Sequence, residues 1–278
     1  MMSSTTASIP TIAQIRASTD VLSVPDALAK VVKVGDDMAV KYGRSVSLLE
    51  AQNLEYVAQN SSVPVPKVLA AFAEQGTGVN FIVMELAPGE PLRDVIESLN
   101  ADEKRGIKDK IRAALDALRS MEPPGYVGSV GRQACADGVF YVPGHDPAFS
   151  GPFENEAATN EGMLRRMAEY EHASYMSLLR TLMARTLKDH RIVFTHGDLQ
   201  PKNIMVHCTG RTEEGNRTFD IKLIDWEISG WYPDYWEFCN ATVGRGFRPE
   251  WMEMVPRILS VPTEEYLMMQ VVRGILFY

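Results

Sequence analysis

An aspartate and an asparagine five positions apart, Asp198 and Asn203, have the residue types and spacing needed for phosphoryl transfer. A second acid, Asp225, follows the largely apolar run 221–224. In transfer from ATP, one carboxylate orients the attacking hydroxyl and accepts its proton, while an amide and a second carboxylate hold the magnesium ions. The spacing therefore predicts Asp198 as the catalytic base, with Asn203 and Asp225 as ligands of Mg²⁺.

The sequence around these three residues reads HGDLQPKN at 196–203 and IDWE at 224–227. Both stretches resemble the aminoglycoside phosphotransferase family, the small-molecule branch of the protein-kinase-like fold. The resemblance extends to residues 40–43, 64–67 and 84–89, so that it covers roughly residues 28–240. It implies an α+β bilobal fold, with a small N-terminal lobe built on an antiparallel sheet with one helix and a larger, mainly helical C-terminal lobe.

The resemblance also implies roles for residues of the N-terminal lobe. Lys41, on an extended run, would bind the α- and β-phosphates of ATP and would be oriented by an acid of the following helix. Glu50 is favoured over Glu55, which lies five residues on and would face another direction on a helix of 3.6 residues per turn. Adenine would be held by the backbone, through the Glu85 carbonyl and the Ala87 amide.

Three further residues are expected to support the site. His196 is interpreted as structural, bonding backbone near the metal-binding aspartate. Glu237 resembles the acid that anchors the catalytic loop from a helix below it. Glu227 either reaches the metal or the substrate or supports the loop, and its position alone does not decide between these. The implied cofactors are ATP and Mg²⁺.

Hydrophobic patterning places these residues on predicted elements. We expect a lead-in over residues 1–25 with a short helix, a first lobe over 1–87 and a second over 88–278. In the first lobe, strands are expected at 29–34, 38–42, 68–73 and 79–86, with a helix at 45–59. A glycine-rich flap over the phosphates is not expected, because only Gly35, in a short turn, precedes Lys41.

In the second lobe, Asn100 and Glu103 form a capping-box pattern at the start of a helix. A stripe from Leu164 to Leu187 predicts one long helix, and residues 204–207 and 221–224 predict a hairpin. Residues 123–162 form an irregular stretch too long for an ordinary connection. We expect the acceptor to bind between this stretch and the catalytic loop, where its acids could attract an amine: Asp137, Asp146, Glu154 and Glu156.

The composition of the chain disfavours several kinds of binding partner. The chain has 278 residues and a net charge of −8, which argues against a nucleic-acid partner because such a partner favours a basic face. No apolar run is long enough to span a bilayer. Three widely spaced cysteines do not suggest a disulfide framework, and a cytoplasmic location is expected. The expected partner is a small-molecule alcohol, with no obligate protein partner evident.

Two rival functions remain to be weighed. A protein kinase is disfavoured, because Gly197 replaces the arginine that would bond a phosphorylated activation loop and only residues 226–230 separate Asp225 from Trp231. A catalytically silent nucleotide-binding protein is the second rival. The presence of all three transfer residues argues against it, whereas the missing glycine-rich flap argues for it.

Overall fold

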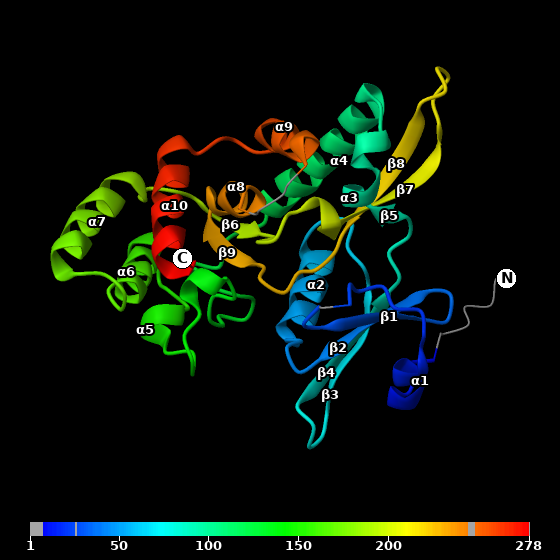
Figure 1. The fold of residues 1–278 in the computed structure, drawn as a ribbon, viewed down its shortest axis with the longest axis horizontal. Coiled ribbons are helices and arrows are strands. Elements are labelled where there is room, and N and C mark those ends of the chain that lie inside the picture. The colour runs from blue at the N-terminus through cyan, green and yellow to red at the C-terminus, as the bar shows by residue number, and fades with distance from the viewer. Residues whose placement is uncertain (1–7, 26, 244–247, 278) are drawn as a thin grey trace.

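The computed structural model describes residues 8–25, 27–243 and 248–277. A small antiparallel sheet occupies one part of the molecule, and a larger set of helices and two short sheets occupies the rest (Figure 1). Residues 1–7 of the predicted lead-in lie outside the described residues. The kinase-like α+β fold predicted from the sequence is confirmed.

The first sheet carries the predicted strands in the order β1-β2-β4-β3. Its members are β1 (Lys30–Val34), β2 (Met38–Gly43), β3 (Val68–Glu74) and β4 (Val79–Glu85). Helix α1 (Ile12–Ala17) packs Ile15 against Val32 and Phe81, so that the lead-in helix covers this sheet. Helix α2 (Leu49–Asn60) packs its apolar residues with Ile82 and Met84 into the main core.

A short linker joins this sheet to the helical part. It leads through β5 (Glu90–Pro91), α3 (Leu92–Val95) and η1 (Ile96–Ser98) to the long helix α4 (Ala101–Arg119). The capping box predicted at the start of α4 is confirmed, because the side chain of Asn100 accepts from the Glu103 amide and Glu103 accepts from the Asn100 amide. The apolar stripe of α4 lies in the main core.

Two small sheets hold the predicted catalytic segments. Strands β7 (Ile204–Arg211) and β8 (Arg217–Leu223) form the expected hairpin, and β7 also pairs with β5. Strand β6 (Ile192–Thr195) pairs with β9 (Gly230–Pro233), a strand that the sequence did not predict. Trp231 and Tyr232 of β9 are fully buried and belong to the hydrophobic core.

The region between α4 and β6 differs from the prediction. The stretch 123–162 contains η2 (Gly138–Phe140), α5 (Pro147–Ser150) and the start of α6 (Glu156–Met167). The single helix predicted from Leu164 to Leu187 is wrong, because α6 ends at Met167 and α7 (Ala173–Thr186) begins anew after His172 caps it. Leu178, assigned to the buried stripe, is 52% exposed, whereas Leu179 is buried.

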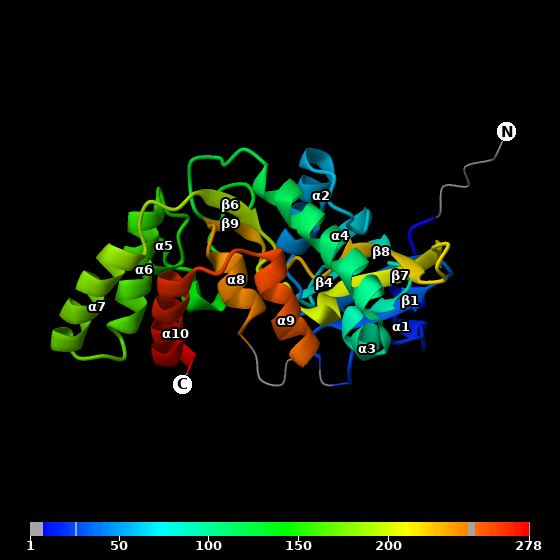
Figure 2. The ribbon, with the colours of Figure 1, turned by 90° about the horizontal axis from the view of Figure 1, so that it is seen from above.

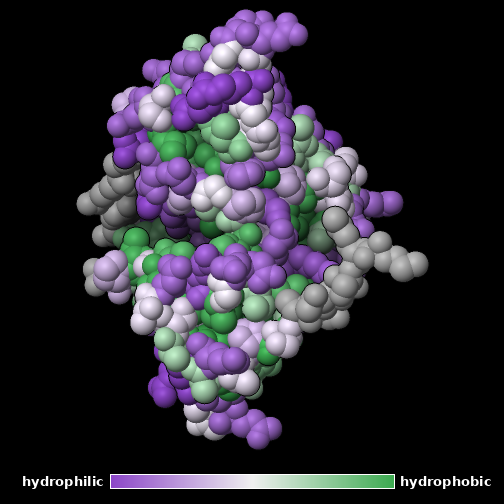
Figure 3. Space-filling view, turned by 90° about the vertical axis from the view of Figure 1, so that its right-hand side faces the viewer, coloured by the Kyte–Doolittle hydropathy of each residue, from purple (hydrophilic) through white to green (hydrophobic). Residues whose placement is uncertain are grey.

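The chain continues as α8 (Trp236–Ala241), α9 (Pro249–Ile258) and α10 (Thr263–Phe277). Helices α6, α7 and α10 gather at the end of the molecule away from the first sheet (Figures 1 and 2). On the opposite side, hydrophilic and hydrophobic residues are interspersed (Figure 3). Within the described ranges, no helix combines the length and the apolar character that crossing a bilayer would require.

Candidate active site

The catalytic loop, residues 196–203, connects β6 to β7. Gly197 has φ +85°, and a Cβ there would lie 2.7 Å from the carbonyl oxygen of Ile228. Glycine is therefore required both by the backbone conformation and by the close approach of the neighbouring segment. Pro201 begins the short turn η3 (Pro201–Asn203), which returns the chain to β7.

Buried side chains hold the start of the catalytic loop from below. Glu237 of α8 accepts from the amides of His196 at 2.7 Å and Gly197 at 3.2 Å. The Ser229 hydroxyl donates to the His196 carbonyl at 2.7 Å, and the Asn240 amide donates to the Gly197 carbonyl at 2.6 Å. Burial raises the pKa of Glu237, and His196 together with the two backbone amides partly offsets this rise. Glu237 occupies the expected place, but Ser229 and Asn240 were not predicted.

The ring of His196 is fully buried, and both of its nitrogens are engaged. Its Nδ1 accepts from the Asp198 amide at 3.2 Å, and its Nε2 donates to the Ile224 carbonyl at 3.0 Å. The ring also packs against Trp226, with centroids 4.5 Å apart. His196 thus links the catalytic loop to the segment that carries Asp225, which is the structural position expected for it.

Asp198 and Asn203 contact each other directly. The Asn203 Nδ2 donates to the Asp198 Oδ2 and to the Asp198 carbonyl, both at 2.8 Å. The Asp198 Oδ1 accepts from the side chain of Gln200, and Lys202 Nζ lies 3.0 Å from the Oδ2. The Asn203 Oδ1 makes no hydrogen bond to any residue in the described ranges. It is therefore left as the oxygen that a cation could use.

A second cluster forms around Lys41. Its Nζ lies 2.7 Å from Glu50, 2.7 Å from Asp225 and 3.0 Å from Glu227. The side chain of Lys41 is only 10% exposed. The ion pair expected between Lys41 and Glu50 is present, whereas Glu55 lies on the exposed side of α2. Glu227 shares the cluster, which brings it next to Asp225.

The charges of this cluster do not balance. Three carboxylates surround one ammonium group, and one oxygen of each lies within 4.8 Å of the others. Burial would lower the pKa of Lys41, but Glu50, Asp225 and Glu227 raise it above its ordinary value. Burial raises the pKa of the Glu50 carboxyl, while Lys41 opposes that shift. The excess of carboxylates over ammonium groups and the oxygen donors suit Mg²⁺, which binds carboxylates and keeps several waters.

The backbone brings the two clusters side by side. The Ile224 amide donates to the Asn203 carbonyl at 3.0 Å, so that the residue before Asp225 bonds the end of the catalytic loop. Asp225 itself has φ +67°, an uncommon conformation for a residue other than glycine. Asn53 of α2 donates to the Trp226 carbonyl at 2.8 Å and fixes the turn that follows. In the described parts of the chain, no hydrogen bond joins the Asp198 side chain to that of Asp225.

The proposed adenine segment begins at the end of β4. The Glu85 carboxylate pairs with Lys222 of β8 at 2.6 Å. The Glu85 amide donates to the Lys67 carbonyl at 2.9 Å, and the Leu86 amide donates to the Asp37 carbonyl at 2.8 Å. These bonds fix the backbone that precedes Ala87. The adenine contacts of Glu85 and Ala87 stay predictions.

A short extended segment that the sequence did not predict precedes β1. Val21 pairs with Val32, and the Leu22 amide donates to the Val31 carbonyl at 2.8 Å, so that a short extended segment lies beside β1. The chain returns from this segment to β1 near the end of β2, where the Ser45 hydroxyl donates to the Leu28 carbonyl at 2.8 Å. The segment contains no glycine, so that it is not a glycine-rich flap of the kind found in kinases. Sequence patterning missed it because it lacks both glycine and strand-like alternation.

The acids of residues 123–162 also need correction. Asp137 is buried and accepts from Trp236 at 2.8 Å and Asn240 at 2.9 Å. Glu156 is buried and bonds His190, while Asp146 caps α5 and Glu154 pairs with Arg132. Two of the four acids are thus structural and buried. The stretch does lie beside the catalytic loop, because Asn240 bonds both Asp137 and Gly197.

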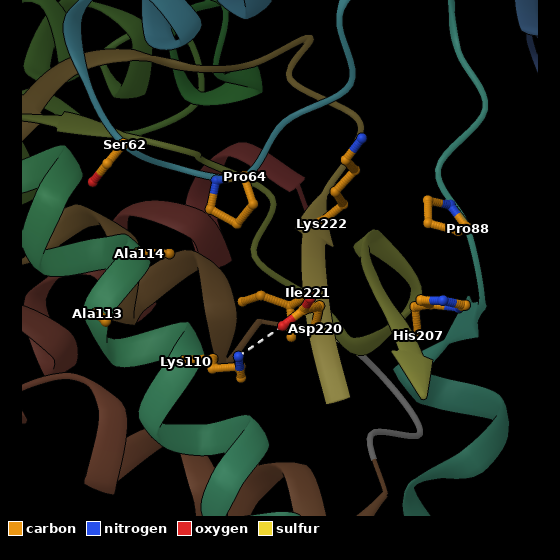
Figure 4. A pocket seen from close by; sticks show the side chains of 10 residues that line it. All are labelled: Ser62, Pro64, Pro88, Lys110, Ala113, Ala114, His207, Asp220, Ile221 and Lys222. Atoms are coloured by element: carbon orange, nitrogen blue, oxygen red, sulfur yellow. Dashed lines mark hydrogen bonds and ion pairs between the residues drawn. The ribbon is translucent and has the colours of Figure 1, made fainter. Parts of the chain in front are cut away.

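A cavity of about 420 Å³ lies apart from these clusters. It is lined by Pro64, Pro88, α4 and the β7–β8 hairpin, and Figure 4 shows Lys110 facing Asp220 across it. None of its lining residues belongs to the predicted site. Its size therefore gives no support to the catalytic assignment.

Residues 32–267 match the family described as the phosphotransferase enzyme family, and the match covers most of the chain. The chain belongs to this family. The resemblance noted from the sequence is thereby confirmed. No curated protein matches the chain.

Solved structures of aminoglycoside phosphotransferases share the fold. A thermostable variant of aminoglycoside phosphotransferase APH(4)-Ia, in a ternary complex with ADP and hygromycin B, is 13% identical, with a TM-score of 0.58 over 95% of this chain and 90% of that one. The complex of APH(2")-IIIa with GDP and kanamycin is 12% identical, with a TM-score of 0.54 over 95% and 87%. The complex of APH(2")-IIa with streptomycin and ATP is 13% identical, with a TM-score of 0.55 over 94% of this chain and 83% of that one. At these identities the likeness shows the fold.

Proposed function

We propose that this phosphotransferase uses ATP and Mg²⁺ to phosphorylate a hydroxyl group of a small molecule. The observation that carries the proposal is the pair of adjacent clusters. Asp198 bonds Asn203 on one side, and Lys41 pairs with Glu50 and Asp225 on the other. Together they supply a base, cation ligands and a phosphate-binding ammonium, which are the parts that phosphoryl transfer needs.

Each side chain has one task in this mechanism. Asp198 orients the acceptor hydroxyl and takes its proton. Lys41, held by Glu50, binds the α- and β-phosphates. Asn203 and Asp225 would hold Mg²⁺, with Glu227 close enough to share in that task. When bound, the cation neutralises charge on the β- and γ-phosphates.

The fold allows a donor site and an acceptor site on opposite sides of the catalytic loop. We place the nucleotide between the first sheet and the β7–β8 hairpin, with the boundary of the two lobes at residues 87/88. We place the acceptor between the catalytic loop and residues 123–162. The complexes of similar proteins contain ADP, ATP or GDP together with an aminoglycoside, which supports a purine nucleotide donor and a small acceptor. The use of ATP suits a cytoplasmic location.

A screen of ATP consumption tests the proposal. It covers alcohols and amino alcohols, including aminoglycosides, with and without Mg²⁺, and repeats each active compound with GTP. Mg²⁺-dependent consumption stimulated by at least one acceptor, and lost in the Asp198→Asn protein, is the expected result. Tight Mg²⁺-dependent ATP binding without turnover on any acceptor would instead establish the catalytically silent protein. If the protein did not bind Mg²⁺ and nucleotide together, both the active phosphotransferase and the catalytically silent nucleotide-binding protein would be overturned.

A further inference from the structure

Lys202 is a cation inside the catalytic loop to which the sequence motif gave no role. It lies in the turn η3, four positions after Asp198 and next to Asn203. Its Nζ is 3.0 Å from the Asp198 Oδ2, and its side chain is 43% exposed. Asp198 is its one ion-pair partner in the described ranges. The ammonium group is therefore held at the edge of the site by a single contact.

The position of Lys202 relates it to both clusters. Lys202 contacts the candidate base Asp198. The residue after it, Asn203, accepts at its carbonyl from the amide of Ile224, which precedes Asp225. In the function proposed above, the γ-phosphoryl group moves towards the acceptor hydroxyl at Asp198, and therefore towards Lys202.

Lys41 lies at the other end of the site. Its ammonium group already lies within 3.0 Å of three carboxylates, on the side of Glu50. Lys202 is free to turn, because a lysine carries three donors on a flexible stem and is bound here at one point only. Negative charge spreads over the three equatorial oxygens of the phosphoryl group during transfer, and a cation aimed at them stabilises that charge.

We propose that Lys202 is a catalytic residue that binds the γ-phosphoryl oxygens during transfer. The inference rests on the function proposed above. As the acceptor oxygen bonds to phosphorus, the bond from phosphorus to the β–γ bridging oxygen breaks and its electron pair leaves with ADP. The acceptor proton passes to Asp198, and Lys202 turns from the Asp198 Oδ2 to the phosphoryl oxygens. Its departure leaves the Asn203 amide as the remaining donor to that carboxylate oxygen, which then accepts the proton.

A simpler role for Lys202 is an exposed ion pair that neutralises Asp198. Such pairs contribute little to stability. The two roles differ in what they predict for the nucleotide. A surface ion pair affects ADP and ATP alike, whereas a ligand of the γ-phosphoryl group distinguishes a triphosphate from a diphosphate.

The test compares nucleotide affinities in the Lys202→Met, Lys202→Arg and Lys110→Met proteins by calorimetry in the presence of Mg²⁺. Lys110 is the matched control, because it forms a 2.8 Å ion pair with Asp220 and is 47% exposed. We expect Lys202→Met to weaken binding of the non-hydrolysable analogue AMP-PNP by about tenfold, the scale of one charge-assisted hydrogen bond, and to leave ADP affinity unchanged. Turnover should fall about 10²-fold, with partial recovery in Lys202→Arg.

Each result separates the two proposals. A Lys202→Met protein whose ratio of AMP-PNP to ADP affinity and whose turnover both match Lys110→Met would overturn the role of Lys202 and leave the proposed function standing. An equal loss of affinity for both nucleotides, with a lower melting temperature, would also overturn it. A wild-type chain that binds neither nucleotide would overturn both proposals.

Discussion

The catalytic loop and the α6–α7 helical pair differ in how closely they follow the local sequence. In the loop, the catalytic residues contact neighbours a few positions away, such as Asn203 to Asp198 and the Asp198 amide to His196, although residues distant in sequence hold the start of the loop. In the helical pair, the buried face is set by packing between distant segments, because α7 packs on α6 and α10. Spacing therefore predicts the catalytic residues of the first region, whereas it assigns the wrong face to the helices of the second.

The comparison predicts that substitutions in the two regions have separable effects. In the loop they should change turnover and leave stability nearly intact. In the helical pair they should change stability and leave turnover per folded molecule intact.

The largest effect is expected at Asp198. In Asp198→Asn the base is lost, while the side chain keeps its size and can still contact Asn203. Turnover should fall about 10²–10⁴-fold, the usual scale of positioned acid–base catalysis. Steady-state kinetics with an acceptor found in the screen measures the loss, and urea unfolding checks that stability is retained. Near-wild-type turnover would remove Asp198 from its role.

The next effect concerns the face of α7. Leu179 is 1% exposed and Leu178 is 52% exposed, so that the two neighbours form a matched pair. Leu179→Ala should lower the free energy of unfolding by about 2–5 kcal/mol. Leu178→Ala should change it by less than about 0.5 kcal/mol. If urea unfolding showed the same loss of unfolding free energy in both variants, the observed orientation of this helix would be contradicted.

A smaller effect is expected at Glu50. Glu50→Gln removes the buried charge that holds Lys41 but leaves Asp225 and Glu227 beside it. We expect ATP to bind about tenfold more weakly, the loss of one hydrogen bond to a charged group. Glu55→Gln, on the exposed side of the same helix, is the control and should bind ATP normally. Equal affinities in the two proteins would count against the Lys41–Glu50 pair as a nucleotide-binding element.

The smallest effect is a pH dependence of stability at His190. Burial would lower its pKa, but the contacts with Glu156 at 2.7 Å and Glu265 at 3.2 Å raise it, with Asp234 adding to the shift. Tyr235 packs against the ring. Because the folded pKa is the higher one, the stabilisation is fully present below the ordinary histidine pKa of about 6.5 and is lost as the pH rises through the folded value.

Urea unfolding between acidic and mildly alkaline pH measures this dependence. The wild-type protein should lose up to about 1 kcal/mol more than His190→Gln as the pH rises, since the group is only partly buried. Turnover should not change in parallel. Identical pH profiles for the two proteins would show that the His190 contacts do not contribute.

The sequence predicted those parts of the site whose residue types are set by chemistry. In the structure Asp198 contacts Asn203, Lys41 pairs with Glu50, and Glu237 bonds the start of the catalytic loop, while the roles of these residues stay predictions. It did not reveal Ser229 or Asn240, because a serine or asparagine that bonds backbone from a distant segment has no local signature. The break between α6 and α7 was missed for a similar reason, since the residues that end α6 carry neither glycine nor proline.

Asp137 is a residue whose structural role the sequence did not reveal. As one acid in an irregular stretch, it was interpreted as a possible attraction for an amine. In the structure it is buried and accepts hydrogen bonds from Trp236 and Asn240. A carboxylate on a loop and a carboxylate in the core look alike in a sequence, and only the partners that the fold supplies distinguish them.

The dependence of ATP binding on Mg²⁺ tests the assignment of the two clusters most directly. Calorimetric titrations of ATP, with and without Mg²⁺, would be made on the wild-type and Asp225→Asn proteins. We expect Mg²⁺ to tighten ATP binding at least tenfold in the wild-type protein, which is about the contribution of one hydrogen bond to a charged group. In Asp225→Asn, Mg²⁺ should have little effect on ATP binding. The assignment of the two clusters would be contradicted if Mg²⁺ did not change the ATP affinity of the wild-type protein, or if it tightened ATP binding equally in Asp225→Asn.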